Sequence, residues 1–155
     1  MIKVFLAALT LAALPALDAA FAGDPTGLWL TQKKGVIVNL YECGDDGALC
    51  GRTVWMKRMV NKDGSPRIDA KNPEPSLRSR HWCGIEVISD VKPAGDGAWK
   101  GGEIYDPKTG DTFDFDISER GDGLKVRGYL GLPLLGKSET WTRTDGAGVS
   151  LCEGA

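Results

Sequence analysis

Apolar and polar residues alternate along short stretches of this chain, and Gly, Pro and Asp cluster between those stretches. The clearest alternation runs from Thr112 to Ile117, where Phe113, Phe115 and Ile117 share one face of a strand and the polar residues share the other. β-branched and aromatic residues favour strands elsewhere as well. Eight strands are predicted in this way, at residues 27–31, 36–41, 52–57, 84–89, 99–105, 112–117, 124–130 and 137–143.

No convincing helix separates these stretches. Sequential antiparallel strands joined by short turns form a meander, and closing the meander into a barrel removes its exposed edges. We therefore predict an all-β fold, an eight-stranded antiparallel up-and-down barrel, with a two-sheet β-sandwich as the alternative. The interior of such a barrel holds either packed side chains or one small ligand.

The connections of an up-and-down barrel alternate between its two ends. One end should collect the turns near residues 43–50, 95–97 and 121–123, which are tight and acidic. The other end, which we call the mouth, should collect the connections at residues 32–35, 61–82, 106–111 and 132–135. The connection 61–82 is the longest of these, and it is basic and rich in Pro.

The N-terminus has the pattern of a secretory signal peptide. Lys3 precedes an apolar run that reaches Leu17, and Ala20-Phe21-Ala22 follows as a small-x-small cleavage site. The run is shorter than the roughly 20 residues that span a bilayer. We expect residues 1–22 to be removed and residues 23–155 to form a single domain in the periplasm or outside the cell.

All four cysteines follow this predicted leader. An even number in an exported chain indicates two disulfides, with three alternative connectivities. Cys43 and Cys50 flank a turn-rich segment whose ends should lie close together, which favours the pairs Cys43–Cys50 and Cys83–Cys152. The alternative is a metal site that includes His81, but the chain has no Cys-x-x-Cys spacing, and we expect no metal and no cofactor.

The charge of the whole chain excludes one class of partner. Lys and Arg number 19 and Asp and Glu number 21, for a formal net charge of -2. A slightly acidic protein has no global attraction to nucleic acid, so any basic site must be local.

The basic group Arg78, Arg80 and His81 is such a local site. One hypothesis is an anion clamp, because Arg presents forked donors that suit a carboxylate or phosphate. The alternative is that these residues anchor the long connection to Glu74, Asp69 or backbone carbonyls, since a long ordered loop needs internal bonds. The chain has one His and no recognisable nucleophile motif, so no catalytic residue is predicted.

Aromatic and apolar residues near the mouth carry two further alternatives. The candidate ligand-binding set adds Trp82, Trp55 and Tyr105 to the basic group, although tryptophans fill a small barrel as readily as they line a pocket. The turn Leu132-Pro133-Leu134-Leu135 could enter a lipid surface or gate the cavity, or it could fold back onto its own core.

Several motifs extend over nearly the whole predicted mature chain. They include Asp24-Pro25-Thr26-Gly27-Leu28-Trp29, Cys50-Gly51-Arg52, Leu77-Arg78-Ser79-Arg80, Cys83-Gly84 and Thr140-Trp141-Thr142-Arg143. In these motifs the chain resembles the bacterial domain of unknown function 2147 family. The resemblance implies an exported protein with a lipocalin-like barrel, and it supplies no catalytic residues because the family has no established activity.

Two features are also similar to lipocalins at large. Gly27-x-Trp29 opens the first strand and Arg143 ends the last, which implies that Arg143 covers Trp29 at the closed end of the barrel. The disulfide that ties the fourth-strand region of lipocalins to the C-terminal tail corresponds to Cys83–Cys152.

Three hypotheses for function follow, from different classes. The first is a small-molecule-binding barrel that takes a mainly apolar ligand with an acidic head at its mouth. The second is an envelope interaction module with a filled barrel, which docks a protein partner or a membrane surface. An enzyme is the third, and the oligomeric state is not predicted.

Overall fold

The computed structural model describes residues 23–152, in which eight β-strands and two short 3₁₀ helices follow one another. The strands are β1 (Gly27–Leu30), β2 (Val36–Glu42), β3 (Leu49–Met56), β4 (Glu86–Gly95), β5 (Ala98–Asp106), β6 (Asp111–Arg120), β7 (Gly123–Tyr129) and β8 (Lys137–Arg143). Helix η1 (Pro75–Leu77) belongs to the long connection after β3, and η2 (Pro133–Leu135) belongs to the turn after β7. The expected leader, residues 1–22, lies outside the described residues.

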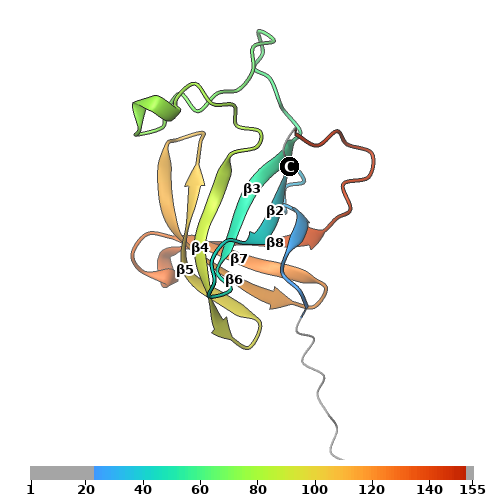
Figure 1. Ribbon diagram of the computed structural model, residues 1–155, viewed down its shortest axis with the longest axis vertical. Helices are drawn as coiled ribbons and strands as arrows, with labels where there is room; N and C mark the ends of the chain where they lie inside the picture. Colours follow the sequence, from blue (N-terminus) through green and yellow to red (C-terminus); the bar gives the residue numbers. More distant parts are fainter. Residues whose placement is uncertain (1–22, 153–155) are drawn as a thin grey trace, which may run out of the picture.

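Each strand pairs antiparallel with its neighbour in sequence, and β1 also pairs with β8, which closes the sheet into a barrel (Figure 1). The closing register places Trp29 opposite Arg143 and Leu30 opposite Thr142. The predicted eight-stranded up-and-down barrel is therefore confirmed, and the alternative of a two-sheet sandwich is wrong.

Several strands are longer than the alternation of side chains indicates. Strand β3 begins at Leu49 rather than Arg52, so Cys50 lies within the strand and not in the preceding turn. Strand β4 runs from Glu86 to Gly95, well beyond Ser89, where the predicted strand ends. Paired strands continue to exchange backbone hydrogen bonds beyond the residues that carry the pattern, so a pattern locates a strand better than it locates its ends.

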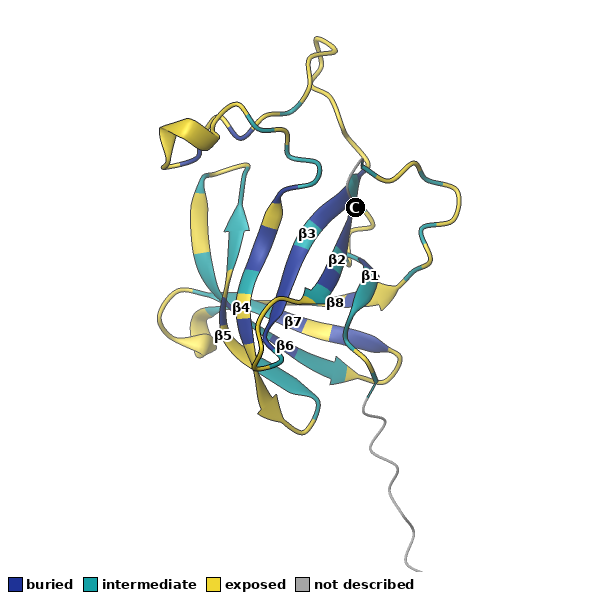
Figure 2. Cartoon of the chain, in the orientation of Figure 1, coloured by how far each residue is buried: buried dark blue, intermediate teal, exposed yellow. Residues whose placement is uncertain are grey.

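Apolar side chains pack together in the interior of the barrel. Phe115 and Ile117, on the strand with the clearest alternation, are 2% and 1% exposed, and the ring centroid of Phe115 lies 6.1 Å from that of Trp141. Most buried positions lie on the strands, and most of the connections are exposed (Figure 2). The core comprises Trp29, Val38, Leu40, Leu49, Ile85, Val87, Ile88, Val91, Phe115, Ile117, Leu124, Val126 and Trp141.

One end of the barrel is closed by the segment that precedes β1. The guanidinium carbon of Arg143 lies 4.3 Å from the ring centroid of Trp29, and the indole N–H of Trp29 donates to the carbonyl of Pro25 at 2.8 Å. Arg143 also donates to the carbonyls of Thr26, at 2.9 Å, and Asp24. A cation held over an indole face and bonded to two carbonyls fixes the entry of the chain into the barrel.

Two disulfides are present, Cys43–Cys50 and Cys83–Cys152, which are the pairs that the sequence favours. After β8 the chain leaves the closed end and returns towards the mouth, where the backbone N–H of Cys152 donates to the carbonyl of Val54 at 2.7 Å (Figure 1). The second bridge therefore ties the C-terminal tail to the long connection. Disulfides are typical of oxidising compartments outside the cytoplasm.

Candidate functional site

A hollow of about 220 Å³ lies between the connection 57–85 and strands β4, β5 and β6. Glu103 and Tyr105 of β5 alternate with Gly102, which pairs with Phe115 of the core, so both lie on the outer face of the barrel. The hollow is therefore on the outside of the wall at the mouth end, rather than in the barrel interior. Its lining residues are Asn72, Pro73, Arg80, Glu86, Val87, Ile88, Ser89, Glu103, Tyr105 and Thr112.

A fully buried carboxylate, Asp69, holds the connection over this hollow. Its Oδ1 accepts a hydrogen bond from the Tyr105 hydroxyl at 2.5 Å. Its Oδ2 accepts from Nδ2 of Asn72 at 2.7 Å and from Nε of Arg80 at 2.9 Å. A buried charge is tolerated where it is paired and its lone pairs are occupied, and here three donors meet that requirement. Asp69 thus joins two parts of the connection to strand β5.

Tyr105 is the wall residue of this group, and its hydroxyl stays protonated. Burial and the adjacent Asp69 carboxylate, which accepts its hydrogen bond, raise the pKa of Tyr105 to about 12. The guanidinium carbon of Arg80 lies 6.0 Å from the ring centroid of Tyr105. The Tyr105 hydroxyl and the Arg80 guanidinium thus lie together at one edge of the hollow, and both donate to Asp69.

Arg78, predicted as half of an anion clamp, is bonded within its own connection. Its Nε donates to the carbonyl of Asn72 at 2.7 Å, and its Nη2 donates to that of Pro73 at 3.5 Å. Arg80 pairs with Asp69 in the same segment. Both guanidinium groups therefore make the anchoring contacts that formed the alternative interpretation of the basic group.

The other predicted ligand-binding residues are not brought into the hollow. His81 is exposed and forms an isolated bridge with Ile68. Trp82 is half-buried, with the guanidinium carbon of Arg67 at 5.0 Å from its ring centroid. Trp55 is half-buried on β3, opposite Ile37 of β2. Of the candidate set, only Arg80 and Tyr105 line the hollow.

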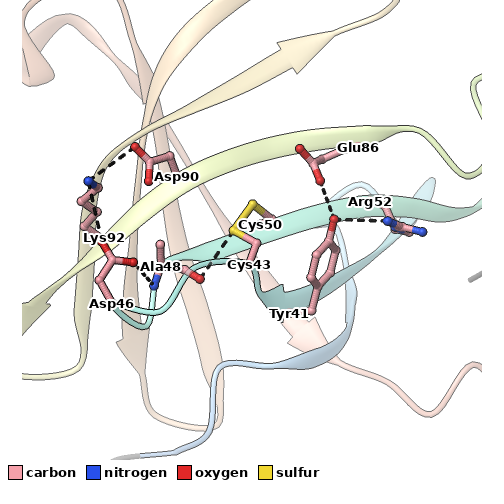
Figure 3. The surroundings of a disulfide bond; sticks show 9 residues. All are labelled: Tyr41, Cys43, Asp46, Ala48, Cys50, Arg52, Glu86, Asp90 and Lys92. Carbon is pink, nitrogen blue, oxygen red and sulfur yellow. Dashed lines mark hydrogen bonds and ion pairs between the residues drawn. A yellow bond between two sulfur atoms is a disulfide. The ribbon is translucent and has the colours of Figure 1, made fainter.

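A second polar group adjoins the hollow through Glu86. The Tyr41 hydroxyl donates to Oε2 of Glu86 at 2.5 Å, and Nη2 of Arg52 donates to the Tyr41 hydroxyl at 3.4 Å (Figure 3). Burial and the Glu86 carboxylate raise the pKa of Tyr41. This group lies beside the Cys43–Cys50 bridge on strands β2, β3 and β4, so three neighbouring strands support the position of Glu86 (Figure 3).

Neither a metal-binding cluster nor a membrane-spanning helix is found among the described residues. Within residues 23–152, no group of three or more His, Cys, Asp or Glu side chains is arranged to hold a metal ion. No helix in this part of the chain is long and apolar enough to cross a bilayer.

A comparison with protein-family models shows which family the chain belongs to. The family model for an uncharacterised protein conserved in bacteria, DUF2147, matches residues 27–143. The chain belongs to this family. The match runs from the first residue of β1 to the last residue of β8, so the DUF2147 region is the whole barrel. A search of the curated proteins finds no match.

A search of the solved structures finds a relative whose title reads "Protein HP1028 from the human pathogen Helicobacter pylori belongs to the lipocalin family". The two chains are 26% identical and superpose with a TM-score of 0.67, and the alignment covers 79% of this chain and 84% of that one. The barrel of this DUF2147 protein is therefore lipocalin-like.

Glu86 and Glu103 are lining residues that the sequence analysis missed. Both lie on predicted strands, at residues 84–89 and 99–105, and both are exposed. Strand parity marks such positions as outward-facing, but it does not show which part of the outer wall a long connection covers. Asp69 was named only as one of several anchors for the basic group.

Proposed function

We propose that this DUF2147 protein binds a small amphipathic molecule in the hollow between the connection 57–85 and strands β4–β6. The supporting observation is that residues of the connection and of three strands meet around one hollow, with polar lining residues such as Arg80, Glu103 and Thr112 beside the apolar Pro73. Ligand sites typically set a few fixed polar groups in an apolar surface. The larger polar share of this lining suits a molecule with a polar head. Eight-stranded barrels such as lipocalins can hold one small ligand in their interior, which supports the class of function although this hollow lies on the outer wall.

The size of the hollow limits the ligand. A volume of about 220 Å³ lies below the roughly 300–1,000 Å³ of typical ligand pockets. It therefore suits a small molecule or the polar head and first carbons of a longer one. The hollow lies on the outer wall and core side chains pack in the interior, so the remainder of a longer ligand would lie along the outer wall.

The charges of the lining favour a ligand with a basic or hydroxyl-bearing head. Glu86 and Glu103 supply two carboxylates, whereas Arg80 supplies one guanidinium whose Nε is already bonded to Asp69. The acidic head predicted from the sequence would rely on Arg80 alone and would meet repulsion from both carboxylates. A cationic head gains from the same two groups.

Calorimetric titration with two probes of equal chain length tests the ligand class. We expect dodecylamine, below its micellar concentration, to bind residues 23–155 more tightly than dodecanoate does. Thr112→Trp fills the hollow from β6 and should abolish this binding, whereas Thr140→Trp, on the outer face of β8, serves as the matched control. Tighter binding of dodecanoate would restore the acidic-head hypothesis, and equal binding by the Thr112→Trp variant would refute the hollow as the site.

We also propose that residues 1–22 direct the chain to the periplasm or the medium. The two disulfides are consistent with that compartment. Native mass spectrometry of the protein purified from the exported fraction checks both points. We expect a mass that begins at Gly23, together with a bound molecule that denaturation releases.

A second candidate function rests on the core side chains that pack inside the barrel. A barrel that these side chains fill would act entirely through its outer surface, as an envelope module that docks a partner. Absence of any bound molecule in the exported protein, combined with no binding of either probe, would favour this function over ligand binding.

A further inference from the structure

The turn between β7 and β8 carries four leucines that do not fold back onto the core. Leu130, Leu132, Leu134 and Leu135 are between 64% and 87% exposed. We call residues 130–136 the leucine turn. Solvent exposure of four large apolar side chains on one short turn marks an interaction surface. This inference does not depend on the hollow beside Tyr105.

The backbone of the leucine turn is bonded within the protein. Arg127 donates from Nε to the carbonyl of Pro133 at 2.6 Å and from Nη2 to that of Leu134 at 3.2 Å. The N–H of Gly131 donates to Oδ2 of Asp114 at 2.8 Å, and the N–H of Leu135 donates to the carbonyl of Leu132 at 3.1 Å. Backbone N–H and C=O groups that enter an apolar phase must form their hydrogen bonds within the protein. The bonds of this turn are already of that kind.

The connections at the two ends of the barrel differ in charge. The connections at the mouth end, residues 31–35, 57–85, 107–110 and 130–136, carry ten Lys or Arg and three Asp or Glu. Those at the closed end, residues 43–48, 96–97 and 121–122, carry four Asp and no Lys or Arg. The mouth end is therefore strongly basic on a chain whose formal net charge is -2.

The mouth end also holds further exposed apolar side chains. Met59, Val60, Ile68 and Leu77 on the connection 57–85 are all exposed. Lys137, the first residue of β8, is exposed next to the leucine turn, and the Arg127 guanidinium lies at its base. The Asp114 carboxylate also lies at this base, where its Oδ2 accepts from the N–H of Gly131. In a membrane surface, the acyl chains accept apolar side chains such as these leucines, and the anionic headgroups attract cations such as Lys137.

We propose that the mouth end docks on the anionic surface of a lipid bilayer, with the leucine turn entering the interface between headgroups and acyl chains. The backbone of the turn is bonded internally, the Arg127 guanidinium lies at its base, and Lys137 follows it in the chain. A protein partner would need a matching groove and could itself supply hydrogen-bond donors and acceptors. A bilayer offers no backbone partners in its apolar region, so the internal bonds of this turn suit it best.

Vesicle co-sedimentation tests this proposal. Residues 23–155 contain all eight strands and both disulfides, and they exclude the apolar segment 1–22, which could bind lipid by itself. We expect binding to vesicles of phosphatidylglycerol and phosphatidylethanolamine, with weaker binding to phosphatidylcholine alone and weaker binding at high salt. The double substitution Leu134→Ser and Leu135→Ser should lower the partition coefficient by about tenfold or more.

The double substitution Leu134→Met and Leu135→Met is the matched control, because it keeps the side chains apolar and should keep vesicle binding. All these side chains are exposed, so circular dichroism and thermal unfolding of the variants should equal those of the parent chain. Absence of binding to the anionic vesicles by the parent chain would overturn the proposal. Unchanged binding by the Ser variant would also overturn it. So would a parent chain that binds no vesicles but forms a dimer in sedimentation equilibrium, if the Ser variant abolishes that dimer.

Discussion

The hydroxyl of Tyr105, on strand β5, donates a 2.5 Å hydrogen bond to the carboxylate of Asp69, 36 residues earlier in the chain. This bond joins the barrel wall to the long connection, and Asn72 and Arg80 extend it from the connection side. The hollow exists because these contacts hold the connection beside the wall. Asp69 and Tyr105 therefore link the stability of the connection to the shape of the candidate site.

Replacing Asp69 with Ala should destabilise the connection. The change leaves the Tyr105 hydroxyl and the Arg80 guanidinium without their shared acceptor, and Arg80 is 32% exposed, so water compensates only in part. We expect a loss of about 2–3 kcal/mol in the free energy of unfolding, measured by urea denaturation. Asp63→Ala, an exposed carboxylate in the same connection, is the control and should cost much less. Equal effects of the two substitutions would contradict the anchoring role of Asp69.

The raised pKa of Tyr105 predicts a specific loss of stability at alkaline pH. The folded protein favours the protonated hydroxyl, with a pKa of about 12 against 10.0 in the unfolded chain. Its contribution is complete below pH 10 and disappears as the pH rises from about 10 to about 12. Urea unfolding of the parent chain and of Tyr105→Phe should show a stability difference that shrinks over this window. Subtracting the variant removes the shared titration of other groups, and a constant difference would refute the prediction.

The barrel was predictable from the sequence because its strands repeat one simple signal. Phe113, Phe115 and Ile117 show the inward face of β6 directly, and Gly-Asp turns mark where neighbouring strands reverse. The disulfide pairs were favoured for a similar reason, since Cys43 and Cys50 flank one tight turn. Local patterns determine these features, so one sequence is enough to locate them.

The candidate site was predictable only in part because it depends on how a long connection folds over the wall. Of the residues predicted to bind a ligand, Arg80 and Tyr105 line the hollow, whereas His81, Trp82 and Trp55 do not, and the ligand-binding role itself stays a prediction. Nothing in the neighbouring sequence marks Asp69 as fully buried, because its burial arises from contacts with residues up to 36 positions away. Long-range packing of this kind has no periodic signal.

The two disulfides should contribute unequally to stability. Cys83–Cys152 spans 69 residues, and Cys43–Cys50 spans 7. In the chain-entropy account, removing the first by a double Cys→Ser substitution costs about 4 kcal/mol, and removing the second costs about 2.5 kcal/mol. Urea denaturation of the two double variants measures the order. A larger loss for the Cys43–Cys50 variant would show that the tail and the long connection keep their positions without their covalent link.

Two glycines that pair with Phe115 of β6, Gly102 from β5 and Gly128 from β7, should respond differently to the same substitution. An added Cβ at Gly102 would lie 2.5 Å from the carbonyl oxygen of Ser89 and 2.7 Å from Cα of Val91. These are backbone atoms of β4, which cannot move without breaking the β4–β5 ladder, so Gly102→Ala should cost about 2 kcal/mol or more. At Gly128 the nearest atom, Cγ2 of Ile104, lies at 3.9 Å, an ordinary contact.

Gly128→Ala is therefore the matched control for Gly102→Ala. It adds the same methyl group to β7. It should lower the free energy of unfolding by much less than Gly102→Ala does. Thermal unfolding of both variants gives the comparison, and amide exchange of β4 locates the damage. Because Gly102 sits between the core and the hollow's wall residue Glu103, the Gly102→Ala variant should also weaken probe binding. Comparable stability of the two variants would mean that β4 and β5 separate more easily than their close approach implies.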